Sequence, residues 1–410
     1  MHNSPTLTIF YQFDPWNSSI GGIQTFICSF LKYAPSEFNV RLVGTGGKNA
    51  AIGKWSEQEF AGRAIEFMPV VRVENDDVRQ IIPTTLKYTY ALSKHDFSSD
   101  FMHFNRIETA LASRRWQGEK ILFVHNDIQK QMSSTDGNNA ILWQKFPAAY
   151  FALESYLFKQ FERIYSCHTE TAKFYRRKYP TRDKSITYLR NTVDREIFYP
   201  LYAERQVQSR NLAKTMGLAE NTRFLLFAGR LHPQKDPLLL IKAFAELTDE
   251  ADTHLLIAGA GELTTEVRLE IANRGLDHKV TLLGAVSQAK LASLHRVSSV
   301  FVLTSAYEGL PLTVLEALSS GTPVVTTNSG ETPNFLTADS GIVCNERTPE
   351  AIAAALKQIL SNPEQYPAEA CVQTAKPYSA KTVVEQVYQD MFERWKSAST
   401  PVNRYLSLAK

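Results

Sequence analysis

No stretch of this 410-residue sequence approaches the roughly 18 consecutive apolar residues of a membrane-spanning helix, so we expect no membrane span. Residues 1–12 lack the basic start, apolar core and small-residue cleavage site of a secretory signal. The four cysteines form no Cys-x-x-Cys pair and are far apart, at Cys28, Cys167, Cys344 and Cys371. We therefore expect reduced thiols in a cytoplasmic protein, with a structural disulfide or a zinc site as the less favoured alternative.

The sequence also lacks a strong charge of one sign. Its formal net charge is +3, and neither this charge nor a stacked-aromatic basic motif supports nucleic-acid binding. The charge is uneven, because residues 1–200 hold 25 Lys and Arg against 20 Asp and Glu, whereas acidic residues slightly exceed basic ones in 201–410. Six cations crowd between Lys173 and Lys184. They form either a solvated helix face or a surface for an anionic partner.

Short apolar runs alternate with helical patterns along the whole chain, which is typical of α/β proteins with parallel sheets. The length suits two or three domains. In the first half, strands are expected at 7–11, 40–43, 101–104, 120–124, 163–166 and 185–189, and helices at 23–31, 107–113, 142–161 and 169–178. In the second half, strands are expected at 224–228, 254–258, 279–283, 299–303, 323–326 and 341–344, and helices at 238–247, 263–273, 288–296, 311–319 and 349–360. The periodicity fades over 191–223, which we interpret as an interdomain crossing, and a last amphipathic stretch covers 380–395.

The sequence thus predicts two doubly wound domains, 1–196 and 197–379, followed by a terminal segment, 380–410. Ligands of open parallel sheets bind outside the carboxyl ends of the strands. We therefore expect a site in a cleft between two facing domains.

The densest motif begins at Ser305 and reads S-A-Y-E-G-L-P-L-T-V-L-E-A-L, with acids at Glu308 and Glu316. Pro311 suits the first position of a helix, and free N–H groups at a helix start favour a phosphate. The Glu316 side chain tilts back toward that start, so both carboxylates can face one pocket. There they would accept hydrogen bonds from sugar hydroxyls, because like charge keeps them from phosphates. Taken alone, two glutamates eight residues apart are more often surface residues.

A second motif, G-R-L-H-P-Q-K-D-P, starts at Gly229 after an apolar strand. Its cations Arg230 and Lys235, if placed in the cleft, would neutralise a diphosphate without a metal. Taken alone, they would more simply be two surface cations.

Together the two motifs resemble those of the retaining glycosyltransferases of family 4 (glycosyl transferases group 1), and the resemblance covers nearly the whole second half. That family has the GT-B fold of two facing Rossmann-like domains with an interdomain cleft, and its terminal helix crosses back to the first domain. The resemblance implies catalytic roles for Arg230, Lys235 and Glu308. It implies donor-binding roles for Gly229, Gly309, Leu310, Leu312, Thr313 and Glu316.

Other positions resemble the same family. Gly21-Gly22-Ile23 is similar to its glycine loop near the donor phosphates, and His125 to its active-site histidine. Gly259-Ala-Gly261 resembles the G-x-G loop of the nucleotide pocket, and Val286 is expected under the base. Asn191-Thr-Val-Asp194 resembles the N-G-V-D segment at the domain crossing.

One loop departs from the family pattern. Where the family often has G-G-x-P-E, this chain has S-G-E-T-P-N from Ser329 to Asn334. Glu331 replaces a glycine and Asn334 replaces the acid, so the contacts of this loop are an open question.

The resemblance implies transfer of a sugar from a nucleotide-diphosphate donor to an acceptor hydroxyl with retained configuration. Arg230, Lys235 and the helix start at Leu312–Thr313 would stabilise the leaving diphosphate. Glu316 would hold the ribose hydroxyls, Glu308 the transferred sugar, and His125 would position donor and acceptor. No side chain stands out as a covalent nucleophile, so we expect a same-face mechanism. No cofactor and no metal are expected, because the acidic cluster Asp76-Asp77 lacks the Asp-x-Asp spacing of metal-dependent transferases.

Three other classes are less favoured. A dinucleotide oxidoreductase would use Gly259-Ala-Gly261, but Thr264 occupies the sixth position of the fingerprint, where Gly or Ala is needed. A non-catalytic sugar-nucleotide-binding module would not need the full set of charged residues. A GT-B epimerase or phosphorylase would differ in whether free nucleotide diphosphate is released.

The expected donor is a UDP-sugar, with UDP-glucose as one candidate and GDP-mannose as the alternative. The expected acceptor is a glycan or a lipid-linked glycan in polysaccharide or envelope biosynthesis. The basic stretch Lys173–Lys184 also contains Phe174, Tyr175 and Tyr179. It could contact anionic lipid reversibly, on the inner face of the plasma membrane.

Overall fold

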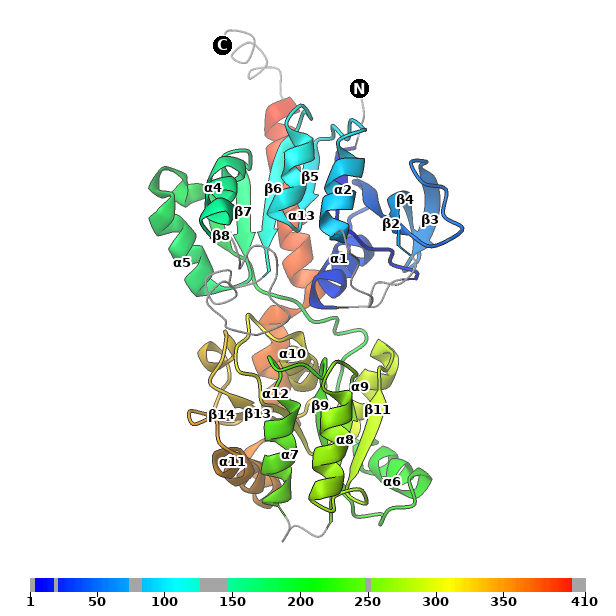
Figure 1. The fold of residues 1–410 in the computed structure, drawn as a ribbon, viewed down its shortest axis with the longest axis vertical. Coiled ribbons are helices and arrows are strands. Elements are labelled where there is room, and N and C mark those ends of the chain that lie inside the picture. Colours follow the sequence, from blue (N-terminus) through cyan, green and yellow to red (C-terminus); the bar gives the residue numbers. More distant parts are fainter. Residues whose placement is uncertain (1–3, 18–20, 74–82, 126–146, 248–251, 400–410) are drawn as a thin grey trace. The chain divides into compact units, whose positions relative to one another are not determined.

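The computed structural model describes residues 4–17, 21–73, 83–125, 147–247 and 252–399. The chain divides into two compact units, which we call unit 1 (residues 1–190 with 380–410) and unit 2 (residues 191–379). Figure 1 shows that each unit is a sheet flanked by helices.

The sheet of unit 1 has the strand order β3-β4-β2-β1-β5-β6-β7-β8, and its neighbours are parallel except for the antiparallel pair β3–β4. Its strands are β1 (Thr6–Phe10), β2 (Asn39–Gly46), β3 (Ser56–Phe60), β4 (Arg63–Arg72), β5 (Phe101–Phe104), β6 (Glu119–Val124), β7 (Arg163–Ser166) and β8 (Ile186–Tyr188). Its helices are α1 (Gly22–Lys32), α2 (Thr84–Leu92), η1 (Ile107–Ser113), α4 (Pro147–Phe158), α5 (Thr169–Lys178), η4 (Pro180–Ser185) and α13 (Ala380–Ser399). The apolar stripe of α1, with Phe26 and Phe30 four residues apart, is buried on this sheet.

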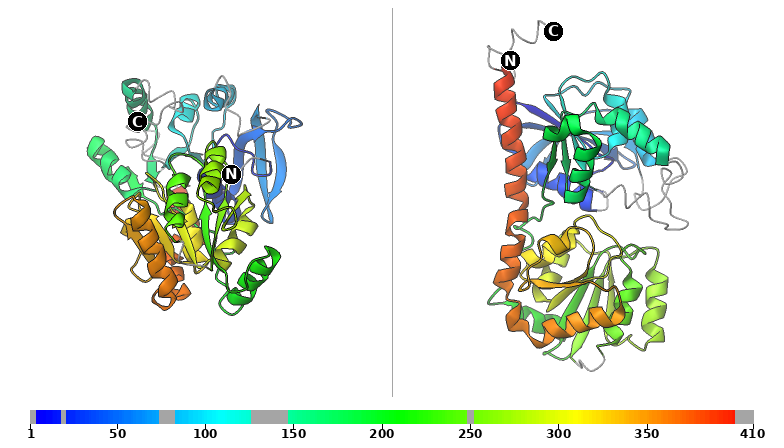
Figure 2. Two further views of the ribbon diagram at one scale, coloured as in Figure 1. Left: turned by 60° about the horizontal axis from the view of Figure 1, so that its bottom comes forward. Right: turned by 90° about the vertical axis from the view of Figure 1, so that its left-hand side faces the viewer.

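The long terminal helix α13 is part of the unit 1 core. Val384, Val387 and Met391 are buried together with residues of β1, β2 and α1. The Tyr388 hydroxyl donates a hydrogen bond of 3.0 Å to the Phe30 carbonyl. Figure 2 shows the helix lying along the sheet of unit 1.

Unit 2 is a six-stranded, fully parallel sheet in the order β11-β10-β9-β12-β13-β14. Its strands are β9 (Arg223–Ala228), β10 (Thr253–Ala258), β11 (Val280–Gly284), β12 (Val300–Leu303), β13 (Val324–Thr327) and β14 (Gly341–Cys344). Its helices are α6 (Arg205–Thr215), α7 (Pro237–Ala245), α8 (Thr264–Asn273), α9 (Gln288–Val297), α10 (Leu312–Ser319), η5 (Thr332–Asn334), α11 (Pro349–Ser361), η6 (Pro363–Gln365), α12 (Ala368–Ala375) and η7 (Lys376–Tyr378). Strands such as Phe224–Ala228 are continuous apolar runs because both faces of a parallel sheet are covered.

The strand order of unit 2 changes direction between β9 and β12. The chain runs outward from β9 to β10 and β11, then returns to place β12 on the other side of β9. In open α/β sheets, ligands bind at such a switch point, beyond the carboxyl ends of the strands. The loops that follow β9 and β12 are the two that carry the predicted charged residues.

The predicted class, two doubly wound α/β units, is confirmed, while several local predictions need correction. The polar segment 191–223, interpreted as a crossing, contains helix α6, and unit 2 begins at Asn191 instead of residue 197. Pro311 is the N-cap residue of α10, with extended φ and ψ, and is not its first helical residue. The β3–β4 hairpin was not expected. The predicted helix 142–161 lies partly outside the described residues, which show α4.

Among the described residues, no helix combines the length and the apolar character that a bilayer crossing demands. No disulfide joins any two of the four cysteines, all of which lie among the described residues.

Candidate functional site

The loop after β9 and the loop after β12 are joined by hydrogen bonds at the switch point of unit 2. The Thr304 hydroxyl donates to the carbonyls of Lys235 and Asp236, at 2.9 Å each. The Ala306 N–H donates to the Gln234 carbonyl at 2.8 Å, and the Gln234 side-chain amide donates to the Tyr307 carbonyl at 3.0 Å. These bonds fix the backbone that carries Lys235 beside the backbone of the motif that begins at Ser305.

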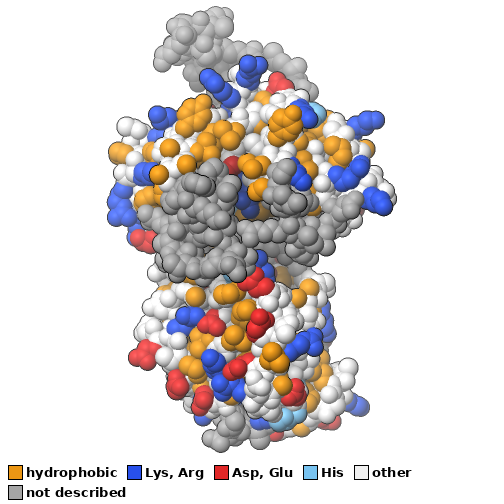
Figure 3. All heavy atoms as spheres, viewed as in Figure 1, with side chains coloured by type: hydrophobic (Ala, Val, Ile, Leu, Met, Phe, Trp, Pro, Cys, Tyr) orange, Lys and Arg blue, Asp and Glu red, His pale blue; other side chains and the backbone are white. Residues whose placement is uncertain are grey.

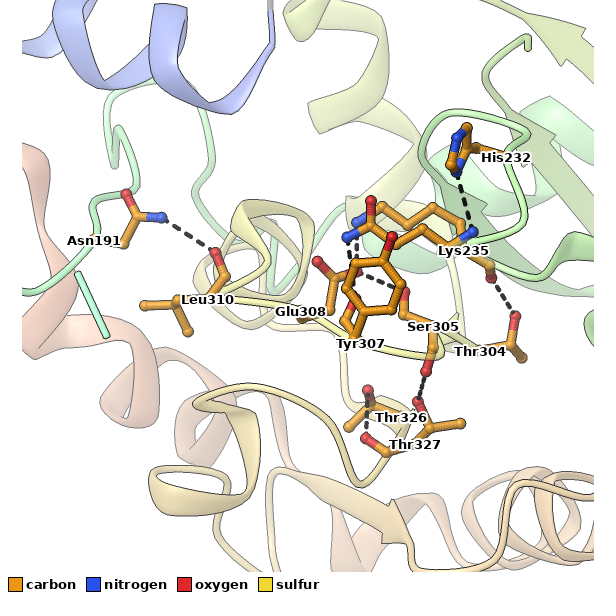
Figure 4. Close-up of polar contacts among 11 residues, drawn as sticks. Asn191, His232, Lys235, Thr304, Ser305, Tyr307, Glu308, Leu310, Thr326 and Thr327 are labelled. Atoms are coloured by element: carbon orange, nitrogen blue, oxygen red, sulfur yellow. Dashed lines mark hydrogen bonds and ion pairs between the residues drawn. The ribbon is translucent and has the colours of Figure 1, made fainter. Parts of the chain in front are cut away.

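Lys235 and Glu308 point toward one another from these two loops (Figure 4), and their ammonium and carboxylate form an ion pair. The same carboxylate oxygen accepts a 2.5 Å hydrogen bond from the buried Ser305 hydroxyl. Glu308 is only 7% exposed, so its charge depends on these two partners. The sequence assigns Lys235 to the diphosphate and Glu308 to the sugar. The geometry makes them a single charge-balanced group.

Arg230 differs from Lys235. Its side chain is exposed, and it makes no ion pair with any residue in the described part of the chain. It is therefore a full positive charge at the carboxyl end of β9, available to an anionic ligand.

Glu316 is buried in α10, eight residues after Glu308. Burial raises the pKa of its carboxyl group to about 8. One of its oxygens, Oε2, is buried without a hydrogen-bond partner among the described residues. A buried acceptor without a donor is costly, and a ligand hydroxyl at this point would relieve that cost. No hydrogen bond or ion pair links Glu316 to Arg230, Lys235 or Glu308, although all four are described.

Leu310, Leu312 and Thr313 lie at the start of α10. Leu310 is buried, and its carbonyl accepts a 3.1 Å hydrogen bond from the Asn191 side-chain amide, which Figure 4 shows reaching toward it. Leu312 and Thr313 are the first two residues of α10 and are half-buried. Their N–H groups face the helix start, where a phosphate is favoured.

The predicted glycines are explained first by close backbone contacts. A Cβ at Gly259 would lie 1.9 Å from the Gly229 carbonyl oxygen, and one at Gly261 would lie 2.3 Å from the Leu231 carbonyl oxygen. A Cβ at Gly330 would lie 2.1 Å from the Gly309 carbonyl oxygen. These glycines let neighbouring loops approach at the carboxyl ends of the strands. Val286, after β11, is half-buried against the unit 2 core.

The atypical loop Ser329–Asn334 packs directly against the motif that begins at Ser305. The Glu331 N–H donates to the Gly309 carbonyl at 2.8 Å. Its buried carboxylate accepts a 3.0 Å hydrogen bond from the Asn334 amide. The two residues that depart from the family pattern, Glu331 and Asn334, are thus hydrogen-bonded to each other.

In unit 1, Gly21 is the N-cap residue of α1 and Gly22 is its first residue, and both are exposed. His125 follows the last residue of β6 and is half-buried. Its Nε2 atom lies 2.9 Å from Oδ1 of Asn105. Burial, and then the positive charge of Arg106, lowers the pKa of His125 to about 3, so the imidazole is neutral at physiological pH.

Sequence reasoning missed Asn105, Ser305, Gln234 and the amide of Asn191, which hold the predicted residues in place. The sequence could have pointed to these residues only through their positions, directly after a predicted strand or within a loop that belongs to a motif. The acidic pair Asp76-Asp77 lies outside the described residues. Within the described ranges, no group of three or more His, Cys, Asp or Glu side chains is placed as a metal-binding cluster.

The predicted basic surface of α5 and η4 is largely neutralised, and Figure 3 shows Lys and Arg side chains spread over both sides of unit 1 in that view. Lys178 forms an ion pair with the buried Glu154, Lys173 with Glu170 and Arg176 with Asp183. The Arg182 guanidinium donates to backbone carbonyls at the end of α4. In the described part of the chain, Arg177 and Lys184 are the two cations of this stretch whose side chains make no such bond.

Residues 208–376 match the model of the family described as "Glycosyl transferases group 1". This region is similar to the group 1 glycosyl transferases, and the match covers less than half of the chain. It contains both motifs, from Gly229 to Glu316.

Two relatives illustrate the similarity. The chain is 30% identical over 183 residues to an Escherichia coli "UDP-Gal:alpha-D-GlcNAc-diphosphoundecaprenol alpha-1,3-galactosyltransferase", covering 44% of this chain and 46% of that protein. It is 37% identical over 144 residues to a Mycobacterium tuberculosis "GDP-mannose-dependent alpha-(1-6)-phosphatidylinositol dimannoside mannosyltransferase", covering 35% and 36%. The matched stretches thus span less than half of either relative.

Among solved structures, the sucrose-phosphate synthase of Thermosynechococcus elongatus superposes with a TM-score of 0.77. The match covers 96% of this chain and 100% of that one, at 15% identity. At this identity the likeness concerns the fold alone, and it confirms the predicted GT-B fold.

Proposed function

We propose that this protein is a retaining glycosyltransferase of family 4, which transfers a hexose from a nucleotide-diphosphate sugar to a hydroxyl of a glycan or lipid-linked acceptor. The observation that carries the proposal is the charge arrangement at the switch point of unit 2. A free cation, Arg230, and an ion pair, Lys235–Glu308, lie in loops that follow neighbouring strands. The buried, incompletely bonded Glu316 lies in the helix that follows.

In this proposal the chain itself supplies the charge that the reaction requires. Arg230, Lys235 and the N–H groups of Leu312 and Thr313 stabilise the negative charge that grows on the leaving diphosphate. Lys235 can share its charge between Glu308 and a phosphate, because Glu308 retains the Ser305 hydrogen bond. Glu308 then orients hydroxyls of the transferred sugar.

Glu316 has a separate task. Its unpartnered Oε2 accepts a hydrogen bond from a ribose hydroxyl of the donor nucleotide, which satisfies a buried acceptor at the moment of binding. The pyrophosphate oxygen released from the donor accepts the proton of the attacking hydroxyl on the same face. No residue of the chain becomes covalently bound to sugar, and no metal is required.

The donor that we propose is a UDP-sugar, with UDP-glucose first among the candidates and GDP-mannose as the alternative. The Escherichia coli relative is named for a UDP-sugar donor, and the Mycobacterium tuberculosis relative is named for a GDP-sugar donor. The decisive experiment incubates the protein with UDP-glucose, UDP-galactose, GDP-mannose and ADP-glucose and measures thermal stabilisation and nucleoside diphosphate release. One donor should raise the melting temperature and release its diphosphate slowly to water, because a ligand that binds only the folded state stabilises it. If none of a broad panel does either, the proposal is wrong.

We also propose a weak contact with anionic lipid through the two unpaired cations of the basic stretch, Arg177 and Lys184. Each cation near an anionic surface contributes about 1 kcal/mol, so two give a marginal, salt-sensitive attachment. Flotation with phosphatidylglycerol vesicles should decrease in the double variant Arg177→Glu, Lys184→Glu and remain unchanged in the control Lys214→Glu, on α6. If the wild type, the double variant and the Lys214→Glu control float equally, or if neutral vesicles give equal flotation, the proposed lipid contact is wrong.

A further inference from the structure

We propose that Asn105 is a positioning residue that fixes the orientation and the tautomer of His125, so that Nδ1 of the imidazole is its ligand-facing acceptor. The inference deepens the proposed function and rests on it, because it specifies how His125 would act on a sugar or acceptor hydroxyl.

The two side chains are brought together by the sheet of unit 1. Phe10, Phe104 and Leu122 lie side by side in the parallel strands β1, β5 and β6. Asn105 directly follows β5 and His125 directly follows β6. Both therefore leave the sheet at its carboxyl edge, where ligands of such sheets bind.

Donor and acceptor chemistry assigns the protons. The side-chain nitrogen Nδ2 of Asn105 lies 3.5 Å from the carbonyl oxygen of Phe10. A backbone carbonyl can only accept, so the Asn105 atom that faces it is the amide nitrogen, and the other terminal atom is the oxygen. That oxygen lies 2.9 Å from Nε2 of His125 and can also only accept. Nε2 therefore carries the proton.

The protonation state of His125 completes the assignment. The ring is neutral at physiological pH, because burial and the nearby Arg106 guanidinium disfavour a second proton. A neutral imidazole with its proton on Nε2 has a lone pair on Nδ1. Nδ1 makes no hydrogen bond to any residue in the described ranges, so it can accept one from a ligand hydroxyl.

The surroundings hold the ring and its backbone still. The Phe26 ring from α1 packs edge-on against the imidazole, with centroids 5.0 Å apart. The Cys167 thiol, just after β7, donates to the His125 carbonyl at 3.2 Å. Asn105 itself is only 5% exposed. Packing alone permits a flipped imidazole, whereas the acceptor oxygen of Asn105 selects one orientation.

The test uses the full chain, labelled with 15N-histidine, and compares Asn105→Leu with Asn105→Asp. Leucine removes the acceptor, while aspartate keeps an acceptor oxygen at the same place. In the wild type, the His125 ring, assigned from the signals lost in His125→Gln, should show an unprotonated Nδ1 and a slowly exchanging Nε2–H proton. The Nε2–H signal should be lost in Asn105→Leu and retained in Asn105→Asp.

Turnover of the donor identified by the nucleotide-sugar panel supplies the second readout. Asn105→Leu should lower kcat at least tenfold with less than a twofold change in donor KM, and Asn105→Asp should lose less. Ser113→Ala is the matched control, since it removes a buried hydrogen bond of 2.9 Å in the same unit without touching His125. It should leave both the imidazole signals and kcat unchanged.

The outcomes separate this inference from the proposed function. A protonated Nδ1 in the folded wild type, or a folded Asn105→Leu variant with wild-type kcat, overturns the role of Asn105 even if donor turnover is observed. If the imidazole signals are as predicted but no donor is turned over, the Asn105–His125 geometry stands and the proposed function is wrong.

Discussion

The Lys235 ammonium and the Glu308 carboxylate form an ion pair that connects the loop after β9 to the loop after β12. In the free protein, one of the two cations expected at the diphosphate is therefore already balanced by the acid expected at the sugar. In the proposed function, donor binding would bring the negative charge of a diphosphate to this pair, and Lys235 would share its charge between Glu308 and the phosphates. Arg230 is exposed and makes no ion pair among the described residues, and in the proposed function it attracts the anionic donor.

Lys235→Met tests this pair. Loss of one preorganised cation should lower turnover on the order of 10²–10³-fold. It should also lower the melting temperature, because Glu308 would be a buried carboxylate without its counter-charge. The double variant Lys235→Met, Glu308→Gln should regain the melting temperature and not the activity. A single variant as stable as the wild type would mean that the pair is unimportant to the fold, and Lys242→Met on α7 is the control for losing a lysine.

Glu316→Gln should make stability less dependent on pH. Burial raises the pKa of Glu316 from the ordinary 4.5 to about 8. Between these values the unfolded chain has released the proton and the folded chain still holds it, so stability falls as pH rises from about 4.5 to 8. The glutamine variant has no carboxyl group at this position and therefore lacks this pH-dependent loss of stability. Its melting temperature relative to the wild type should therefore increase over that range and level off above it.

The matched control for this titration is Glu364→Gln, in η6, because the Glu364 side chain is exposed. Its stability relative to the wild type should be constant from pH 5 to 9. A Glu316→Gln difference that is equally flat would show that the Glu316 carboxyl titrates normally.

Gly259→Ala should destabilise unit 2. The added Cβ would lie 1.9 Å from the Gly229 carbonyl oxygen, and the residue has a φ of 142°, which side chains rarely adopt. Strain and clash of this kind cost about 1–3 kcal/mol, measurable as a lower midpoint of urea unfolding. Gly47→Ala is the control, since nothing lies within 4 Å of its Cβ position. An unchanged midpoint in Gly259→Ala would refute the close approach of the two loops.

Activity should survive removal of divalent cations. The positive charge required by a leaving diphosphate is proposed to come from Arg230, Lys235 and the start of α10, so excess EDTA should leave turnover within about twofold of the untreated rate. Abolition by EDTA, with recovery on addition of Mg²⁺ or Mn²⁺, would contradict the proposed metal-independent mechanism. The Lys235→Met variant should be equally insensitive to EDTA.

The elements that could be predicted are the buried strands, because a short run of apolar residues marks each of them in the sequence. Strands at 101–104, 163–166 and 341–344 match the structure residue for residue. The β3–β4 hairpin escaped prediction because β3, Ser-Glu-Gln-Glu-Phe, is almost entirely exposed. Helix α6 escaped because it buries only Ala213, so its sequence has no apolar stripe.

The candidate site divides in the same way. Residues within local motifs, such as Lys235 and Glu308, were placed by sequence, whereas their pairing depends on two loops 73 residues apart. Asn105 belongs to no motif, and Ser305 stands in a motif without a role that the motif assigns to it. Their importance comes from the neighbours that the tertiary fold gives them, and a single sequence does not contain that information.

Unit 1 is discontinuous, because the buried face of α13 completes a core begun by β1 and α1. A ribosome therefore delivers the whole of unit 2 before it delivers the last piece of unit 1. Unit 1 therefore cannot complete its core until translation is nearly finished, and part of its hydrophobic surface stays uncovered until then. Premature termination shortly before residue 380 would thus damage the half of the molecule that was synthesised first.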